Sequence, residues 1–138
     1  MFDDCLYFNT AALARCLERE WALAVAPLGL TAPQAFTLRA VLSQPGLLQS
    51  ELAQVLLIAR PTATRALDAL VAKGLVVRRA TARDGREVAI HPTPEAHGLK
   101  AALLAAVSSV TSGLQCRLGD EGLAQATQRV RALRSALA

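Results

Sequence analysis

Apolar residues recur at helical spacing near the beginning of the chain. Those that share one helical face are Leu6, Leu13, Leu17 and Trp21. We therefore predict a first helix that begins at the acidic pair Asp3–Asp4, because these carboxylates can accept hydrogen bonds from the free N–H groups of a first turn. Pro27 and Gly29 then end the helix.

Two further helices are predicted at the other end of the chain, over residues 94–117 and 120–137. In the second of these the apolar positions alternate in steps of three and four, at Leu123, Ala126, Val130, Leu133 and Leu137. This spacing is typical of a helix–helix seam, either within one protomer or between two. The terminal helices flank a compact central segment, so we expect a single domain, residues 1–138, in which 1–28 and 94–138 form the interface of a dimer.

The central segment, residues 31–92, has the pattern of a helix-turn-helix. Thr31 and Gln34 have the spacing of a capping box, which predicts the start of a helix that Pro45 and Gly46 end. A short helix over 49–56 and another from Pro61 to a glycine at position 74 follow closely. Two short helices this close together are typical of a helix-turn-helix.

A short hairpin is predicted directly after these helices. Residues 75–79 form the first strand, 83–86 a tight turn that contains Asp-Gly, and 87–90 the returning strand. A basic hairpin in this position is a wing. The predicted fold class is therefore mainly α with a small β-wing: a winged helix-turn-helix with about six helices and a two- to three-stranded antiparallel sheet.

Composition supports a soluble dimer. Apolar residues make up 53% of the 138 residues, an excess that a subunit interface would bury. The longest uninterrupted apolar run, residues 101–107, is too short to cross a membrane, and Asp3 and Asp4 stand where a signal peptide would be basic. We expect a cytoplasmic protein without a membrane partner.

Positive charge is confined to one part of the chain. Residues 60–86 hold seven bases and two acids, a net charge of +5, whereas the whole chain has +4 and the remainder is therefore at −1. Such a concentration is typical either of a phosphate-binding surface or of a solvated basic face. Double-stranded DNA is the partner that the wing and this charge together predict.

Candidate chemistry is sparse elsewhere. The three cysteines, Cys5, Cys16 and Cys116, lack metal-binding spacing, and His91 and His97 have no neighbouring ligands, so no metal site or cofactor is expected. The chain has no Gly-rich phosphate loop and no histidine beside a candidate nucleophile. We therefore expect no enzyme and no catalytic residue.

The order of elements and four short stretches resemble the MarR family of bacterial transcription regulators. The stretches are Leu52-Ala-Gln-Val-Leu56, Arg60-Pro-Thr-Ala-Thr-Arg65, Leu70-Val-Ala-Lys-Gly-Leu75 and Asp84-Gly-Arg86. The resemblance covers nearly the whole chain and implies a homodimer with interlocked terminal helices. It also implies that the helix from Pro61 enters the major groove and each wing the flanking minor groove. A repressor on an inverted-repeat operator is the expected function.

The resemblance and the chemistry of the side chains nominate DNA-contacting residues. Arginine can grip guanine bidentately or enter a narrow minor groove, and threonine suits phosphates or thymine methyl groups. The candidates are Arg60, Thr62, Thr64, Arg65, Arg78, Arg79, Arg83 and Arg86. The resemblance further assigns Asp84, with Gly85, to the structure of the wing. For each arginine, the alternative is a plain surface charge.

Three positions in and around the helix-turn-helix depart from the family pattern, and after the wing Pro92 and Ala96 replace the usual leucine and glycine. Leu48 and Ala59 stand where a polar residue usually caps the two helices, and Leu57 stands where the turn usually has glycine. A missing cap costs about 1 kcal/mol. These departures leave an alternative function open, a winged-helix dimer that binds protein and has weak DNA affinity.

The resemblance also implies a signal that releases DNA: a small phenolic or lipophilic ligand, or an oxidant. Trp21, Phe36 and Arg39 are the candidate lining of a ligand cleft, with packing in the core as the alternative. Cys5 and Cys116 are the candidate redox sensors, and the alternative for both is a small buried hydrophobic residue.

Overall fold

The protein was studied as a computed structural model, which describes residues 1–81 and 86–138. Six α-helices, one 3-10 turn and three strands occur in this part of the chain: α1 Leu6–Val25, η1 Ala26–Leu28, α2 Ala32–Ser43, β1 Leu47–Leu48, α3 Gln49–Leu56, α4 Arg60–Ala72, β2 Val76–Ala80, β3 Val88–Pro92, α5 Pro94–Leu118 and α6 Asp120–Leu137. The mainly α winged helix-turn-helix predicted from the sequence is confirmed.

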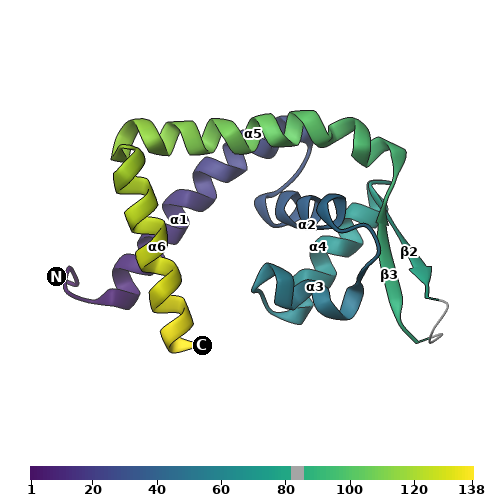
Figure 1. Cartoon of the computed structure of the whole chain (residues 1–138), viewed down its shortest axis with the longest axis horizontal. Helices are drawn as coiled ribbons and strands as arrows, with labels where there is room; N and C mark the ends of the chain where they lie inside the picture. Colours follow the sequence, from purple (N-terminus) through teal and green to yellow (C-terminus); the bar gives the residue numbers. More distant parts are fainter. Residues whose placement is uncertain (82–85) are drawn as a thin grey trace.

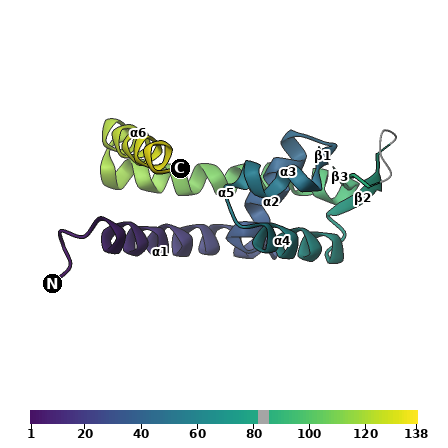
Figure 2. The same ribbon diagram turned by 90° about the horizontal axis from the view of Figure 1, so that it is seen from below.

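The elements divide into a lobe and an arm. In Figure 1 the lobe comprises α2, α3, α4 and the small sheet, while α1, α6 and the far half of α5 form the arm. Helix α1 runs obliquely up to α5 in Figure 1 and contacts it, and α6 folds back from the end of α5 (Figures 1 and 2). Both termini lie in the arm, away from the wing (Figure 1).

Helix boundaries follow local hydrogen bonds. At α2 the predicted capping box is present: the backbone N–H of Gln34 donates to Oγ1 of Thr31 at 3.3 Å, and the backbone N–H of Thr31 donates to Oε1 of Gln34 at 3.2 Å. The prediction that Asp3 or Asp4 caps α1 is wrong, because both precede the helix and the N-cap residue is Cys5, which makes no side-chain cap bond. Instead, Nδ2 of Asn9 donates to the carbonyls of Asp3 and Cys5.

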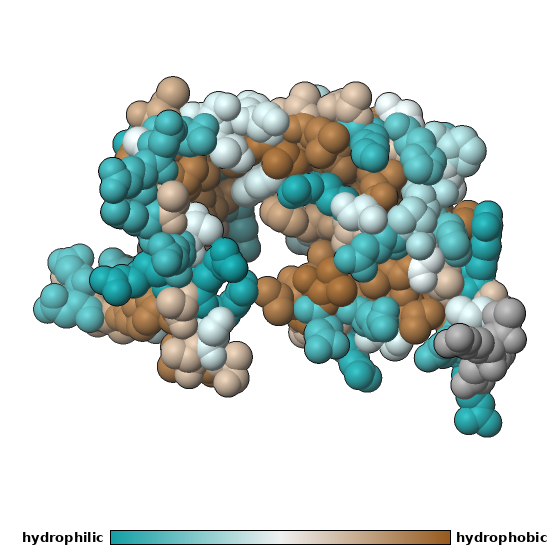
Figure 3. Space-filling model, in the orientation of Figure 1, coloured by the Kyte–Doolittle hydropathy of each residue, from teal (hydrophilic) through white to brown (hydrophobic). Residues whose placement is uncertain are grey.

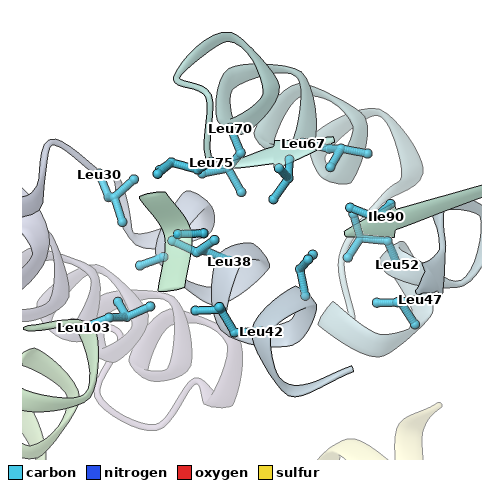
Figure 4. Packing of buried hydrophobic residues seen from close by; sticks show 14 of the residues in the cluster. Leu30, Leu38, Leu42, Leu47, Leu52, Leu67, Leu70, Leu75, Ile90 and Leu103 are labelled. Atoms are coloured by element: carbon cyan, nitrogen blue, oxygen red, sulfur yellow. The ribbon is translucent and has the colours of Figure 1, made fainter. Parts of the chain in front are cut away.

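The hydrophobic core lies inside the lobe, between α2, α4 and the sheet. Leu38 of α2, Leu67 and Leu70 of α4, Ile90 of β3 and Leu103 of α5 are at most 1% exposed. Figure 4 shows these side chains converging from their separate elements. Truncation of a buried leucine costs about 2–5 kcal/mol, so this cluster fixes the position of α4 against the rest of the lobe.

The sheet has the strand order β1-β3-β2, with both pairs antiparallel. Strand β1 has only two residues, Leu47 and Leu48, which pair with Ile90 and Ala89. Strands β2 and β3 form the wing, in which Arg79 lies opposite Ala89. The backbone N–H of Thr81 donates to the carbonyl of Glu87 at 3.2 Å and extends this pairing toward the tip.

The arm exposes large apolar side chains. On the first helix and the segment before it they are Met1, Phe2, Leu6, Tyr7, Phe8, Leu13 and Leu23, and at the end of the chain they are Leu118, Val130, Leu133 and Leu137. Helix α6 has no buried residue, so the seam predicted from its sequence lies on the surface of the protomer. The space-filling view shows apolar surface on the arm as well as on the lobe (Figure 3).

By length and composition alone, α5 is apolar enough to cross a membrane, and α1 with α2 would qualify as one bent span. The uninterrupted apolar run within α5 is shorter than the helix, which explains why its sequence did not suggest a span. Here α5 packs against α1, α2 and α6. A core helix of a soluble protein has the same composition, so this property is weak support for a membrane helix.

Candidate nucleic-acid interface

The turn between α3 and α4 contains a leucine in a left-handed conformation. Leu57, the C-cap of α3, has φ 56° and ψ 41°, and it is the one non-glycine residue with positive φ in the described part of the chain. Its N–H donates to the carbonyl of Gln54 at 3.3 Å, and that of Ile58 donates to Ala53 at 3.1 Å. Leu57 thus adopts the conformation that glycine usually supplies at a helix end, at a steric cost.

Helix α4 begins without a side-chain cap. Its N-cap residue is Ala59, as the sequence implied, and Pro61 occupies the first turn. Pro61 lacks an N–H group and has a φ suited to a helix, which reduces the number of donors that need a cap. The backbone N–H of Ala63 donates to the carbonyl of Ala59 at 3.1 Å, so the helix starts regularly. Leu57 and Ala59 therefore raise the free energy of the turn, but α4 still begins as a regular helix.

The two faces of α4 differ in chemistry. The buried face consists of Ala63, Ala66, Leu67 and Leu70. Arg60, Thr64 and Arg65 lie on the exposed face, together with Asp68. The remaining candidate on this helix, Thr62, is half-buried, and its Oγ1 accepts a hydrogen bond from Nη2 of Arg65 at 3.4 Å. The exposed face can therefore present two arginines and one threonine to a DNA groove.

Arg78 of β2 connects the wing to α3 and α4. Its Nη2 donates to Oδ1 of Asp68 on α4, and its Nε donates to Oε1 of Gln49 on α3 at 3.0 Å. The Arg78 side chain is 31% exposed, and its charge is partly balanced by Asp68. The wing is thus tied to both helices of the helix-turn-helix. Arg79, the next residue, is exposed.

A hollow separates the recognition helix from the wing. It has a volume of about 430 Å3 and is bounded by α3, α4 and the beginning of β3. Arg60 and Thr64 of α4 line it together with Arg86, which lies two residues before β3 in the sequence. The structure therefore brings together two arginines that are far apart in the sequence. Glu87 also lines this hollow and adds one negative charge to it.

Three candidate residues, Arg83, Asp84 and Gly85, lie outside the described residues. Among the other bases of the segment 60–86, Lys73 turns away from the basic face: its Nζ donates to the carbonyl of Gly29 and to Oε1 of Gln34, the latter at 3.0 Å. Sequence reasoning counted Lys73 in the basic segment and missed Gln49 and Asp68 as partners of Arg78. No spacing in the sequence indicates these long-range pairs.

A cleft lies between α1, α2 and the helix-turn-helix turn. It has a volume of about 590 Å3, and Trp21 and Phe36 line it. Their ring centroids are 4.8 Å apart with the planes at 55°. Arg39 does not line the cleft; its Cζ lies 5.6 Å from the centroid of the Phe36 ring. A charged residue that the sequence did not nominate, Glu18, lines it instead.

All three cysteines are exposed in the single protomer. Cys5 is the N-cap of α1 and Cys116 lies near the end of α5. Cys16, which the sequence did not nominate as a sensor, accepts a hydrogen bond at Sγ from Nη2 of Arg19 at 3.2 Å. No group of three or more metal-ligating side chains occurs among residues 1–81 and 86–138.

A recognition helix held by a hydrophobic core, a basic wing braced to it and a hollow lined by two arginines define a winged helix-turn-helix DNA-binding protein. Residues 28–87 match the sequence model of the MarR family. This segment, which contains the helix-turn-helix and most of the wing, is therefore similar to the MarR family of winged helix-turn-helix DNA-binding transcription regulators. Members of this family are regulators without enzymatic activity, in agreement with the sequence analysis. Among curated proteins, none matches the sequence.

Solved structures of low sequence identity share the fold of nearly the whole chain. A mutant of the MarR protein from E. coli in complex with operator DNA has a TM-score of 0.85 at 22% identity, over 96% of this chain and 97% of that one. The MepR–DNA complex from S. aureus has a TM-score of 0.84 at 22% identity, over 95% and 97%. The transcriptional repressor CouR bound to p-coumaroyl-CoA has a TM-score of 0.86 at 23% identity, over 96% and 94%.

Proposed function

We propose that this regulator is a cytoplasmic repressor that acts as a homodimer on an inverted-repeat operator and releases DNA when a small lipophilic ligand binds in the cleft. The observation that carries the proposal is the exposed apolar seam of α6. Exposure of a row of leucine and valine side chains to water is unfavourable, because burial of each one would stabilise the protein by about 1.5–3 kcal/mol. A second copy of the chain is the partner that such a seam fits.

In the proposed dimer two copies of the DNA-binding surface would face the same DNA. With a two-fold axis through the arms, two lobes would present their recognition helices to successive major grooves, about 34–36 Å apart. Arg60, Thr64 and Arg65 would then contact base edges or phosphates, and Arg79 with Arg86 the flanking backbone or minor groove. An inverted repeat follows from the symmetry.

The alternative function, a protein-binding module, rested on the missing caps and on Leu57. Helix α4 nevertheless starts regularly at Arg60, and Leu57 adopts the conformation that the turn requires. Since these departures leave the recognition helix in place, we favour DNA as the partner.

The role of the cleft rests on its position. Its walls include Leu56 and Ile58 of the turn and Thr62 of the recognition helix, and it has the size of a small-molecule site. A ligand that is bound there and that moves this turn would change the angle of α4 and weaken DNA binding. CouR, bound to p-coumaroyl-CoA, is an example of a repressor of this fold with an organic ligand. A second route to release, oxidation of Cys5 or Cys116, has support only from their exposure.

One experiment tests dimer and operator together. Leu133→Glu places a charge in the seam, and Gln128→Glu places the same charge on the exposed opposite side of α6. We expect Leu133→Glu to halve the mass measured by sedimentation and to abolish specific binding of the upstream DNA in fluorescence anisotropy. Gln128→Glu should behave as the wild type. A Leu133→Glu protein that keeps its mass and its operator affinity would contradict the proposal, as would equal affinity of the wild type for a scrambled DNA.

A further inference from the structure

The cleft between α1, α2 and the helix-turn-helix turn contains a single ionisable side chain among its lining residues. Its walls are mostly apolar or aromatic, and the polar exceptions are Glu18 of α1 and Thr62 of α4. Glu18 lies one helical turn from Trp21, so its carboxylate and the indole share the same face of α1. Glu18 is an exposed residue, so the one charge on the wall of the cleft is negative and lies in contact with water.

No base inside the described part of the chain neutralises this carboxylate. The salt bridges there join Asp3 to the N-terminus, Asp68 to Arg78 and Glu20 to Arg117, and none includes Glu18. Among neighbouring bases, Arg19 donates to Cys16, and Arg39 lies against the ring of Phe36. The charged residue that lines the cleft is thus Glu18 and not Arg39, which was the expected cation. Glu18 has no partner at ion-pair distance among the described residues.

From this charge and this shape we infer that the cleft binds an apolar organic cation, and that Glu18 sets the preference for positive charge. The inference rests on the proposed ligand-controlled function and specifies the chemical class of its ligand. Trp21 and Phe36 offer faces on which a cation or an aromatic ring can stack. An organic anion, such as a phenolic carboxylate, would meet the carboxylate of Glu18 without a compensating base.

The walls of the cleft also connect a bound ligand to the DNA-binding surface. Thr62 lines the cleft, and its hydroxyl accepts a hydrogen bond from Arg65 on the exposed face of α4. The same wall contains Leu56 and Ile58, which flank the left-handed Leu57. A ligand in the cleft therefore contacts the start of the recognition helix directly.

Two ions of the same shape and opposite charge test the inference without any DNA, so that its failure is distinguishable from failure of the proposed repressor function. Tetraphenylphosphonium and tetraphenylborate are both bulky, aromatic and apolar. Their affinities are measured by calorimetry, and Trp21, the only tryptophan in the chain, reports occupancy of the cleft by quenching of its fluorescence. We expect the wild type to bind the phosphonium about tenfold tighter or more, because a partly hydrated charge still discriminates between signs at short range.

The variants assign the preference to one residue. Glu18→Gln should bring the two affinities to within about twofold, and Glu18→Lys should reverse the preference. Glu95→Gln, the matched control, removes the same charge from an exposed position in the first turn of α5 and should keep the wild-type preference. Equal binding of both ions by the wild type, tighter binding of the borate, or a preference that survives in Glu18→Gln would overturn the inference.

Discussion

The left-handed Leu57 should reverse the usual ranking of glycine and alanine in a helical region. An L-residue in this conformation is disfavoured by about 1–2 kcal/mol, whereas glycine adopts it freely. Glycine in turn stabilises the unfolded chain by about 0.4–1 kcal/mol through its greater freedom. Leu57→Gly and Leu57→Ala both remove the same side chain, which is 63% exposed, so its contacts cancel in the comparison. Leu57→Gly should therefore be more stable than Leu57→Ala by about 0.5–1 kcal/mol.

Urea unfolding, followed by circular dichroism, measures this difference. With a slope of about 1–3 kcal/mol per molar urea, the midpoint of Leu57→Gly should lie about 0.2–1 M above that of Leu57→Ala. Both proteins must be compared at one concentration, since dissociation of a dimer contributes to the midpoint.

Gln54, an exposed residue of α3, supplies the matched control. Its position is helical, so Gln54→Gly should be about 1 kcal/mol less stable than Gln54→Ala, the usual order. If alanine is equal to or better than glycine at position 57 as well, the left-handed conformation carries no strain and the reasoning is refuted.

Three further substitutions concern the recognition helix. Ala59→Ser supplies the N-cap hydroxyl that α4 lacks and should raise stability in the same urea assay by about 1 kcal/mol; no gain would mean that the N–H groups of the first turn are already satisfied. Arg65→Ala should weaken operator binding in fluorescence anisotropy by about 1–3 kcal/mol and random DNA much less, and equal losses would exclude a base-reading role. Asp68→Asn releases Arg78 from its ion pair and should strengthen binding to every DNA, with a salt dependence steeper by up to about 0.9; an unchanged slope would place Arg78 away from the phosphates.

Local signals predicted the fold well because each depends on neighbouring residues. The capping box of Thr31 and Gln34 joins residues only three positions apart, and the glycine at position 74 has positive φ just after α4, as is common at a helix end. Strand β1 was missed as an element because two residues have no periodicity, and its only signal is the pairing of Leu47 with Ile90. The acidic pair Asp3–Asp4 led to a wrong start for α1, because the side chain of Asn9, not an aspartate, makes the hydrogen bonds near the beginning of this helix.

The sequence indicated which residue types belong to the candidate site, but not which way each side chain points. Arg60 and Arg65 are exposed as expected, whereas Arg78 contacts Asp68 and Gln49 across the fold. Residue type alone also failed at the cleft, where Arg39 was the expected charge. The guanidinium of Arg39 lies against the ring of Phe36, and the charged residue that lines the cleft is Glu18.

Helix α5 connects the lobe to the arm as one uninterrupted rod of 25 residues. At 1.5 Å per residue it is about 37 Å long, so a tilt of only about 5° at the arm displaces the lobe by about 3 Å. That displacement is close to the 3.4 Å rise of one base pair. In the proposed dimer α5 would therefore act as a lever: a small rotation near the two-fold axis would become, at the recognition helix, a displacement large enough to separate a matched from a mismatched operator spacing.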